Sequence, residues 1–161
     1  LKRFHKEKKK GKVKVVDLGQ VGDVEVIDPH LIELLIDNDY IPVIAPIGYG
    51  EDYQDYNINA DMFAGHMAAA LDAGHFVVLT DVDGLMKDKD DPNTLIKEIS
   101  REDVKNEIGG IVQGGMIPKT ESCIAALEGG VAHAYIINGM KKNILTEIFT
   151  EKKFKGTIIK N

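Results

Sequence analysis

Three short polar segments carry residue types that could bind a ligand and act on it. They are Tyr56–Asp61 (YNINAD), Thr80–Gly84 (TDVDG) and Gly114–Lys119 (GGMIPK). Each lies where a predicted strand or loop gives way to a helix. Open α/β folds bind ligands at such junctions, at the carboxyl ends of parallel strands and the amino ends of helices. The three segments are therefore the candidate binding and catalytic regions of the chain.

Lys119 and Asp61 are the charged residues of greatest chemical interest. Lys119 lies near the start of a predicted helix, where its charge opposes the helix dipole unless an anion binds nearby. It is either an anion-binding group or a surface lysine. Asp61 lies in the first turn of an alanine-rich helix, and either complements that dipole or holds a lysine ammonium. The pair Gly114-Gly115 either brings backbone amides close to a phosphate or forms a simple turn.

The acidic segment Asp81–Met86 follows an apolar strand, and is either the edge of a nucleotide site or an ordinary connection. It is not an EF-hand loop, because Gly84 directly follows the second aspartate instead of a third ligand position. The sequence has no GxxxxGK[S/T] loop, which excludes a P-loop protein. Its five histidines lack metal-site spacing, so we predict no protein-built metal site.

Composition limits the class of protein. With 161 residues the chain suits one domain, and its net charge of −6 argues against a nucleic-acid partner. No stretch approaches the roughly 18 apolar residues of a membrane span. The lone Cys123 excludes an internal disulfide and suits a reducing cytoplasm. We expect a solvated basic lead-in over residues 1–15, rather than a phosphate-binding patch, followed by one domain over residues 16–161.

Strands are predicted to alternate with helices along the chain. The expected strands cover 13–18, 24–27, 41–47, 76–80, 95–99, 133–137 and 156–159, and the expected helices 28–38, 59–71, 101–108, 118–127 and 143–149. The apolar run Ile41–Ile47 is typical of a strand buried between helical layers, with its prolines restricting it to a strand end or an edge. The alternation predicts an α/β fold, a three-layer αβα sandwich with a mainly parallel sheet.

In this order the segments resemble the amino-acid kinase family, and within it the acetylglutamate kinases. The resemblance runs over nearly the whole chain from Val16, and is strongest over 41–46, 57–61, 79–84, 114–119 and 147–150. It implies the carboxy-terminal, ATP-binding portion of such a kinase. The implied reaction is ATP-dependent phosphorylation of the side-chain carboxylate of N-acetyl-L-glutamate in arginine biosynthesis. Mg²⁺ would be held mainly through the phosphates, and the full-length form would be a homo-oligomer.

The same resemblance implies roles for individual residues. Lys119 would stabilise the phosphoryl group during transfer, and Asp61 would orient Lys119 and a second lysine. Asn57 would contact acetylglutamate, with Asn59 nearby. The implied nucleotide-binding residues are Thr80, Asp81, Val82, Asp83, Gly84, Leu85, Met86, Ile111, Val112, Gln113, Gly115 and Met116.

The chain also departs from the family pattern. The Lys-x-Gly-Gly loop, second glycine pair and substrate-binding arginine of the amino-terminal half have no counterpart upstream of Val16. We therefore expect little turnover without that missing half. Tyr53 and Phe154 stand where glycines are usual, and arginine inhibition is not implied. Two alternatives stay open, namely a non-catalytic nucleotide-binding or assembly module derived from such a kinase, and a sister kinase for an aminoadipate-type carboxylate.

Overall fold

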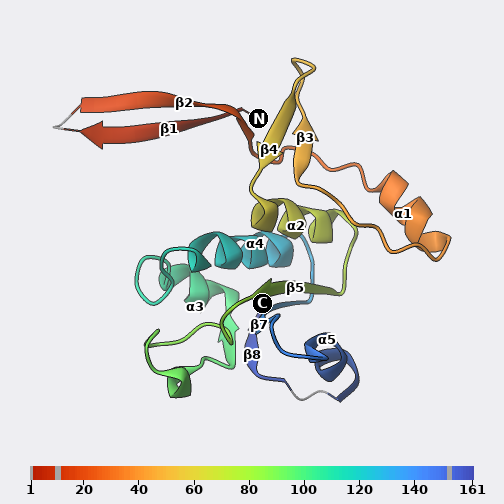
Figure 1. Cartoon of the computed structure of the whole chain (residues 1–161), viewed down its shortest axis with the longest axis vertical. Helices are drawn as coiled ribbons and strands as arrows, with labels where there is room; N and C mark the ends of the chain where they lie inside the picture. Colours follow the sequence, from red (N-terminus) through yellow and green to blue (C-terminus); the bar gives the residue numbers. More distant parts are fainter. Residues whose placement is uncertain (1, 10–11, 152–153) are drawn as a thin grey trace.

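The computed structural model describes residues 2–9, 12–151 and 154–161, with side chains described over 16–150 and 154–161. It consists of two four-stranded sheets, with helices α2 and α4 lying between them (Figure 1). The predicted α/β class, with helices layered on sheets, is confirmed. The strands are divided between two sheets rather than gathered in one, and each sheet combines parallel and antiparallel pairs.

The first sheet has the order β1-β2-β4-β3. Strands β1 (Lys2–Lys9) and β2 (Lys12–Gly22) form an antiparallel pair that projects from the body of the molecule (Figure 1). The basic stretch expected as a lead-in therefore contributes strand to this sheet. Strand β4 (Asp55–Ile58) runs parallel to β2, and β3 (Ile47–Tyr49) pairs antiparallel with β4.

The second sheet has the order β5-β7-β8-β6. Strands β5 (His75–Thr80) and β7 (His133–Asn138) are parallel over their whole length. Strand β8 (Gly156–Lys160) runs antiparallel to β7, and β6 (Glu98–Ser100) runs parallel to β8. The predicted strands 76–80, 133–137 and 156–159 thus correspond to the central part of this sheet.

The helices follow their sequence signals closely. Asn59 accepts a hydrogen bond from the Met62 N–H at the start of α2, and Ser100 accepts one from Asp103 at the start of α3. The longest described helix, α4, has 13 residues, and no described helix is long and apolar enough to cross a bilayer. The helices are α1 (His30–Asp37), α2 (Ala60–Ala70), η1 (Pro92–Thr94), α3 (Arg101–Asn106), α4 (Met116–Glu128), α5 (Ile144–Thr146) and the π-helical η2 (Glu147–Glu151).

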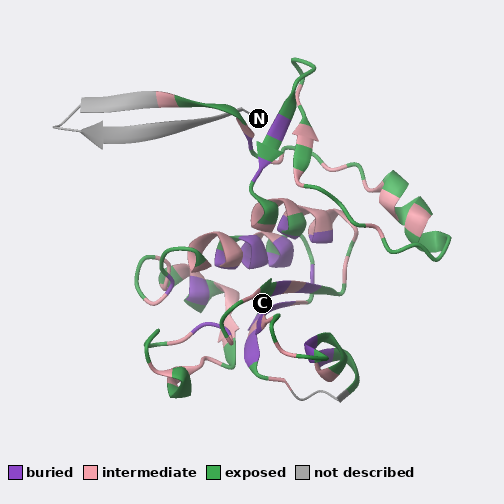
Figure 2. Cartoon of the chain, viewed as in Figure 1, coloured by how far each residue is buried: buried purple, intermediate pink, exposed green. Residues whose placement is uncertain are grey.

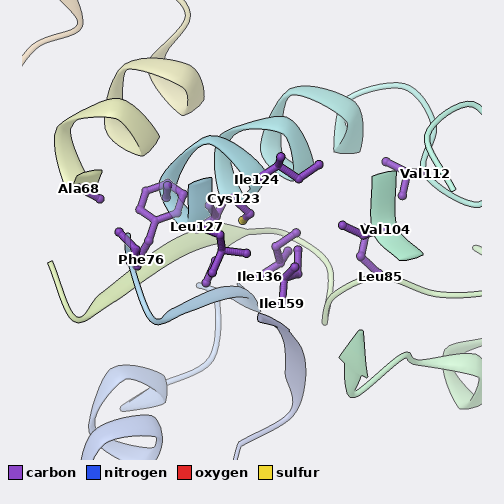
Figure 3. Close-up of a cluster of buried hydrophobic side chains, with 14 residues drawn as sticks. Ala68, Phe76, Leu85, Val104, Val112, Cys123, Ile124, Leu127, Ile136 and Ile159 are labelled. Atoms are coloured by element: carbon purple, nitrogen blue, oxygen red, sulfur yellow. The ribbon is translucent and has the colours of Figure 1, made fainter. Parts of the chain in front are cut away.

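The hydrophobic core lies around the second sheet (Figure 2). On one face of this sheet, Phe76, Ile136 and Ile159 pack with Leu127 of α4, as the close-up shows (Figure 3). On the other face, a smaller cluster joins Tyr135 and Ile137 to Ile144 and Ile148. Because successive residues of β7 point to opposite faces, this strand is buried on both sides.

Two predicted strands are wrong. Residues 24–27 are not in a strand, and the run over 41–47 forms no strand before Ile47. The latter run is also exposed rather than buried: the relative exposure of Ile41 is 90% and that of Val43 is 96%. A continuous apolar run becomes a buried strand only where strands flank it and layers cover it. No described strand lies alongside residues 41–45.

Candidate active site

The second sheet brings its polar strand ends to one edge. Thr80 and Asn138 are register partners at the carboxyl ends of β5 and β7. Gly156, at the start of the antiparallel β8, is the partner of Ile137 and so lies at the same edge. The connections that follow Thr80 and Asn138, and the one that precedes Gly156, therefore converge.

Helices α2 and α4 return their amino ends to this edge. The carboxyl end of α2 leads into β5 through residues 71–74, and that of α4 leads into β7 through residues 129–132. Each helix packs on the sheet and runs opposite to the strand that follows it. Asp61, in the first turn of α2, and Lys119, in the first turn of α4, consequently lie at the ligand-binding end of an α/β unit.

Lys119 and Asp61 form a direct ion pair. Lys119 Nζ lies 3.1 Å from Asp61 Oδ1 and 3.2 Å from Oδ2. The two side chains are 24% and 23% exposed, so a ligand can reach them. An ammonium has three N–H donors, and a carboxylate that holds it leaves capacity for a further anionic acceptor. Of the two roles considered for Asp61, the structure shows the carboxylate holding a lysine.

The ion pair depends on close packing between α2 and α4 at Gly65. A Cβ atom added at Gly65 would collide with the backbone carbonyl oxygen of Ser122. Ser122 is fully buried, and its hydroxyl donates to the Lys119 carbonyl at 2.7 Å. A glycine inside an otherwise alanine-rich helix is the sequence signal for such a contact, which our sequence reading did not use.

The two predicted nucleotide segments line one pocket of about 520 Å³. Met86 contributes from the first segment, Ile111 and Gln113 from the second, and Met116 from the start of α4. The Gln113 amide donates to the Gly110 carbonyl at 2.6 Å and fixes this second segment. The full lining is Val82, Gly84, Leu85, Met86, Lys87, Asp88, Lys89, Gly110, Ile111, Gln113 and Met116.

Thr157 of β8 fixes the first of these segments, a role that the sequence reading missed. Its buried hydroxyl accepts from the Leu85 N–H at 2.8 Å and donates to the Ile96 carbonyl at 2.6 Å. Gly84 has φ +151°, and a Cβ there would lie 2.5 Å from Thr157 Oγ1. The chain can turn at this point only because residue 84 is glycine. A threonine in an otherwise apolar strand was the available signal.

Asp83 is held by partners from three connections. Its carboxylate lies 2.6 Å from Lys141 Nζ and 2.7 Å from Lys155 Nζ, and accepts from Asn138 Nδ2 at 3.1 Å. Lys141, followed by Lys155, holds the pKa of this carboxyl well below its usual range. The Asp83 side chain is only 15% exposed. It therefore ties the pocket segment to the connections around β7 and β8, and neither lysine was among the predicted site residues.

Replacing Asp83 with asparagine should lower the free energy of unfolding by about 1–3 kcal/mol at pH 7. The native pKa is depressed, so the contribution is complete above the unfolded pKa of about 3.9 and is lost as the pH falls through the native value. Urea unfolding at pH 7 and at pH 3 should show the gap between wild type and variant shrinking at the lower pH. Glu121→Gln, an exposed carboxylate on α4, is the control. An equal gap at both pH values would contradict the assignment.

The remaining predicted residues take varied positions. Thr80 donates its hydroxyl to the Asp81 carboxylate at 3.1 Å, beside the pocket rather than in its lining. The Val112 side chain is 1% exposed and belongs to the core, so it does not line the pocket. Gly115 precedes α4 but is also outside the lining. Asn59 caps α2, whereas Asn57 is exposed on β4.

Cys123 is a core residue rather than a nucleophile. It is fully buried, and burial raises the pKa of its thiol to about 12. Across the described ranges, no three His, Cys, Asp or Glu side chains group as ligands for a metal ion.

Comparison with known proteins decides the family. The amino acid kinase family matches residues 3–138. The chain belongs to this family. The expectation drawn from the order of the three polar segments is confirmed at this level, and the match includes the Asp61–Lys119 pair and both segments that line the pocket.

Family members of known activity include close relatives of the chain. It is 48% identical over 151 residues to the acetylglutamate kinase of Methanothermobacter thermautotrophicus, covering 92% of this chain and 51% of that protein. It is 46% identical over 162 residues to the acetylglutamate kinase of Heliobacterium modesticaldum, covering 99% and 55%. The chain thus spans about half the length of the curated relatives it matches.

A solved family structure shares the fold. The N-acetylglutamate synthase from Neisseria gonorrhoeae, complexed with coenzyme A and L-arginine, matches with a TM-score of 0.80 and 23% identity. The match covers 99% of this chain and 36% of that protein. At this identity the likeness concerns the fold alone.

Proposed function

We propose that this chain is the ATP-binding portion of an acetylglutamate kinase, which transfers the terminal phosphoryl group of ATP to the side-chain carboxylate of N-acetyl-L-glutamate. The observation that carries the proposal is the Lys119–Asp61 ion pair, at the sheet edge that also bears the pocket of about 520 Å³. The names and identities of the relatives support the choice of reaction within the family. The place of this reaction is arginine biosynthesis, in the cytoplasm.

The chemistry suits these residues. The acceptor carboxylate is already ionised at neutral pH, so the reaction needs no strong general base. The difficulty lies in bringing two anions together and stabilising the charge on the phosphoryl group in flight. Lys119 supplies a positive charge for that group, and Asp61 keeps the ammonium in place before the substrates bind.

The nucleotide binds in the pocket between the two predicted segments. Met86, Ile111 and Met116 give it apolar walls suited to a base, and Gln113 adds a polar group. Mg²⁺ usually binds phosphates with few protein ligands, and when bound it bridges phosphate oxygens and screens their charge. No protein-built cage is needed for that arrangement. Asp83, already engaged by Lys141 and Lys155, acts by positioning the pocket wall.

Acetylglutamate binds beside the start of α2. Asn57 is the exposed residue of β4 that lies closest in sequence to Asp61, and we assign it the contact with acetylglutamate. The side-chain oxygen of Asn59 is already engaged as the cap of α2, which leaves its amide group for a ligand. The chain alone binds nucleotide but turns over slowly, because phosphate-binding groups of the missing amino-terminal half are required.

Binding of Mg·ATP to the isolated chain tests the nucleotide part of this proposal. Calorimetry should detect binding, and Met116→Glu should weaken it at least about tenfold by placing a carboxylate in an apolar pocket wall. Met140→Glu is the matched control, because Met140 is 82% exposed and lies outside the pocket. The absence of binding, or equal binding by both variants, would refute the assignment of the pocket.

Activity restored in trans tests the reaction. Adding the amino-terminal portion of the Methanothermobacter thermautotrophicus enzyme should yield acetylglutamyl phosphate from ATP and N-acetylglutamate. Preference for an acetylated aminoadipate would indicate the sister kinase instead. Nucleotide binding without any product would support a non-catalytic module.

A further inference from the structure

Exposed apolar side chains are concentrated in one part of the molecule. Every large exposed hydrophobic residue before residue 56 lies within 18–53, and that stretch carries most of those found in the described chain. The buried hydrophobic residues, in contrast, all lie between 56 and 159. Figure 2 shows the same division, with the exposed colour dominating around α1, β3 and the segments that join them. Apolar patches of this extent mark surfaces that another polypeptide covers.

Helix α1 illustrates the division. It is amphipathic, yet none of its residues is buried, and it lies away from the rest of the molecule (Figure 1). Leu31 and Leu34 lie three residues apart on the helix and are 63% and 53% exposed. An eight-residue helix is marginal in water by itself, and helices of this length are stabilised by packing of their apolar face. The apolar face of α1 therefore lacks its covering layer.

The extended segment after α1 has unused backbone groups. No hydrogen bond joins the backbone of residues 41–44 to another described residue. Ala45 and Pro46 do accept bonds, from the Ile47 and Ile58 N–H groups at 2.8 and 3.0 Å. The segment is thus anchored at its end, while Ile41, Val43 and Ile44 expose both side chains and backbone. Such an edge is suited to pairing with an added strand.

A groove lies in the same region. It has a volume of about 710 Å³, and Val26 and Ile47 on one side face Ile58 and Phe63 on the other. Asn57, between Tyr56 and Ile58 on β4, is not part of its lining, because alternate residues of a strand face opposite sides. The groove is therefore separate from the residue to which we assign acetylglutamate.

We propose that α1, the segment 41–47 and this groove form the docking surface for the portion of an acetylglutamate kinase that this chain does not match. This inference rests on the proposed function. The chain matches about half of each relative, so a portion of similar size remains to cover the surface. That portion contributes an apolar strand that pairs with residues 41–45, and apolar side chains that cover α1 and enter the groove.

The test joins the amino-terminal portion of the Methanothermobacter thermautotrophicus enzyme to the full chain through a protease-cleavable linker, so that both parts fold together. After cleavage the two polypeptides should co-elute in gel filtration. Amide exchange at Val43 and Ile44 should slow in the complex relative to the chain alone. Val43→Asp should weaken the association at least about 100-fold, because it places a charge within an apolar interface. Met140→Asp, equally exposed but distant in sequence, should leave it unchanged.

Mg·ATP binding, measured on the same samples, separates this inference from the proposed function. Retained binding by Val43→Asp shows that the variant is folded, so its loss of association supports the docking surface. A complex that forms as proposed without ATP binding would refute the function and leave the surface intact. Separation of the wild-type parts after cleavage, or association that is insensitive to Val43→Asp, would overturn the inference. Self-association of the chain through this face in place of the complex would also overturn it.

Discussion

Replacing Lys119 with methionine should lower the rate of acetylglutamyl phosphate formation by about 10³-fold in the assembled enzyme, while ATP affinity changes by less than about threefold. Methionine keeps the length of the side chain but removes the charge. The ground-state nucleotide retains its pocket contacts through Met86, Ile111 and Gln113. The loss therefore falls on kcat, where charge on the moving phosphoryl group must be stabilised. Trapping the product as a hydroxamate gives the rate, and calorimetry gives the affinity.

Two comparisons make this result specific. Lys97→Met removes an exposed lysine outside the site and should leave the rate unchanged. Asp61→Asn should also slow the reaction, and the double variant Asp61→Asn/Lys119→Met should be no slower than Lys119→Met, because Asp61 acts through Lys119 at 3.1 Å. A rate within tenfold of wild type for Lys119→Met would remove Lys119 from the reaction.

Gly65→Ala should lower the melting temperature by about 5–10 °C, from about 2–3 kcal/mol of overpacking between α2 and α4. The added methyl group meets the Ser122 carbonyl, which belongs to the backbone and cannot rotate away as a side chain can. The helices must separate, and the Asp61–Lys119 pair at their amino ends separates with them. We therefore expect a loss of kinase activity that exceeds the fraction of unfolded protein.

Gly74→Ala is the matched control for this prediction. No atom lies within 4 Å of a Cβ built at Gly74, so its melting temperature should change by less than about 2 °C. Differential scanning calorimetry of the two variants and the wild type measures the difference. Equal melting temperatures for Gly65→Ala and Gly74→Ala would show that the interface between the helices can relax.

Local signals explain which parts of the fold could be predicted. Asn59 and Ser100 initiate their helices with side-chain caps, and the runs 76–80 and 133–137 are apolar enough to be central strands. The pairing of Asp61 with Lys119 joined residues 58 positions apart, and was expected only because the resemblance supplied it. The family assignment likewise came from motif order rather than from any single residue.

The errors and omissions have a different physical origin. Whether residues 41–47 become a buried strand depends on neighbouring strands, which the run itself does not encode. The contacts of Asp83 with Lys141 and Lys155 link positions far apart in the chain, without any periodic pattern between them. The role of Thr157 depends on the positive φ of Gly84, which becomes visible only when both are placed together.

The position of β8 has a consequence for biosynthesis. This strand is made last, yet it lies between β7 and β6, and its Thr157 fixes the segment around Leu85. On the ribosome, β6 has no neighbour and the hydrophobic residues facing Ile159 stay uncovered until translation terminates. Release of the nascent chain is thus the step that completes the nucleotide pocket. A premature stop codon that removes only the final strand would leave a product for chaperones and proteases rather than a weakened enzyme.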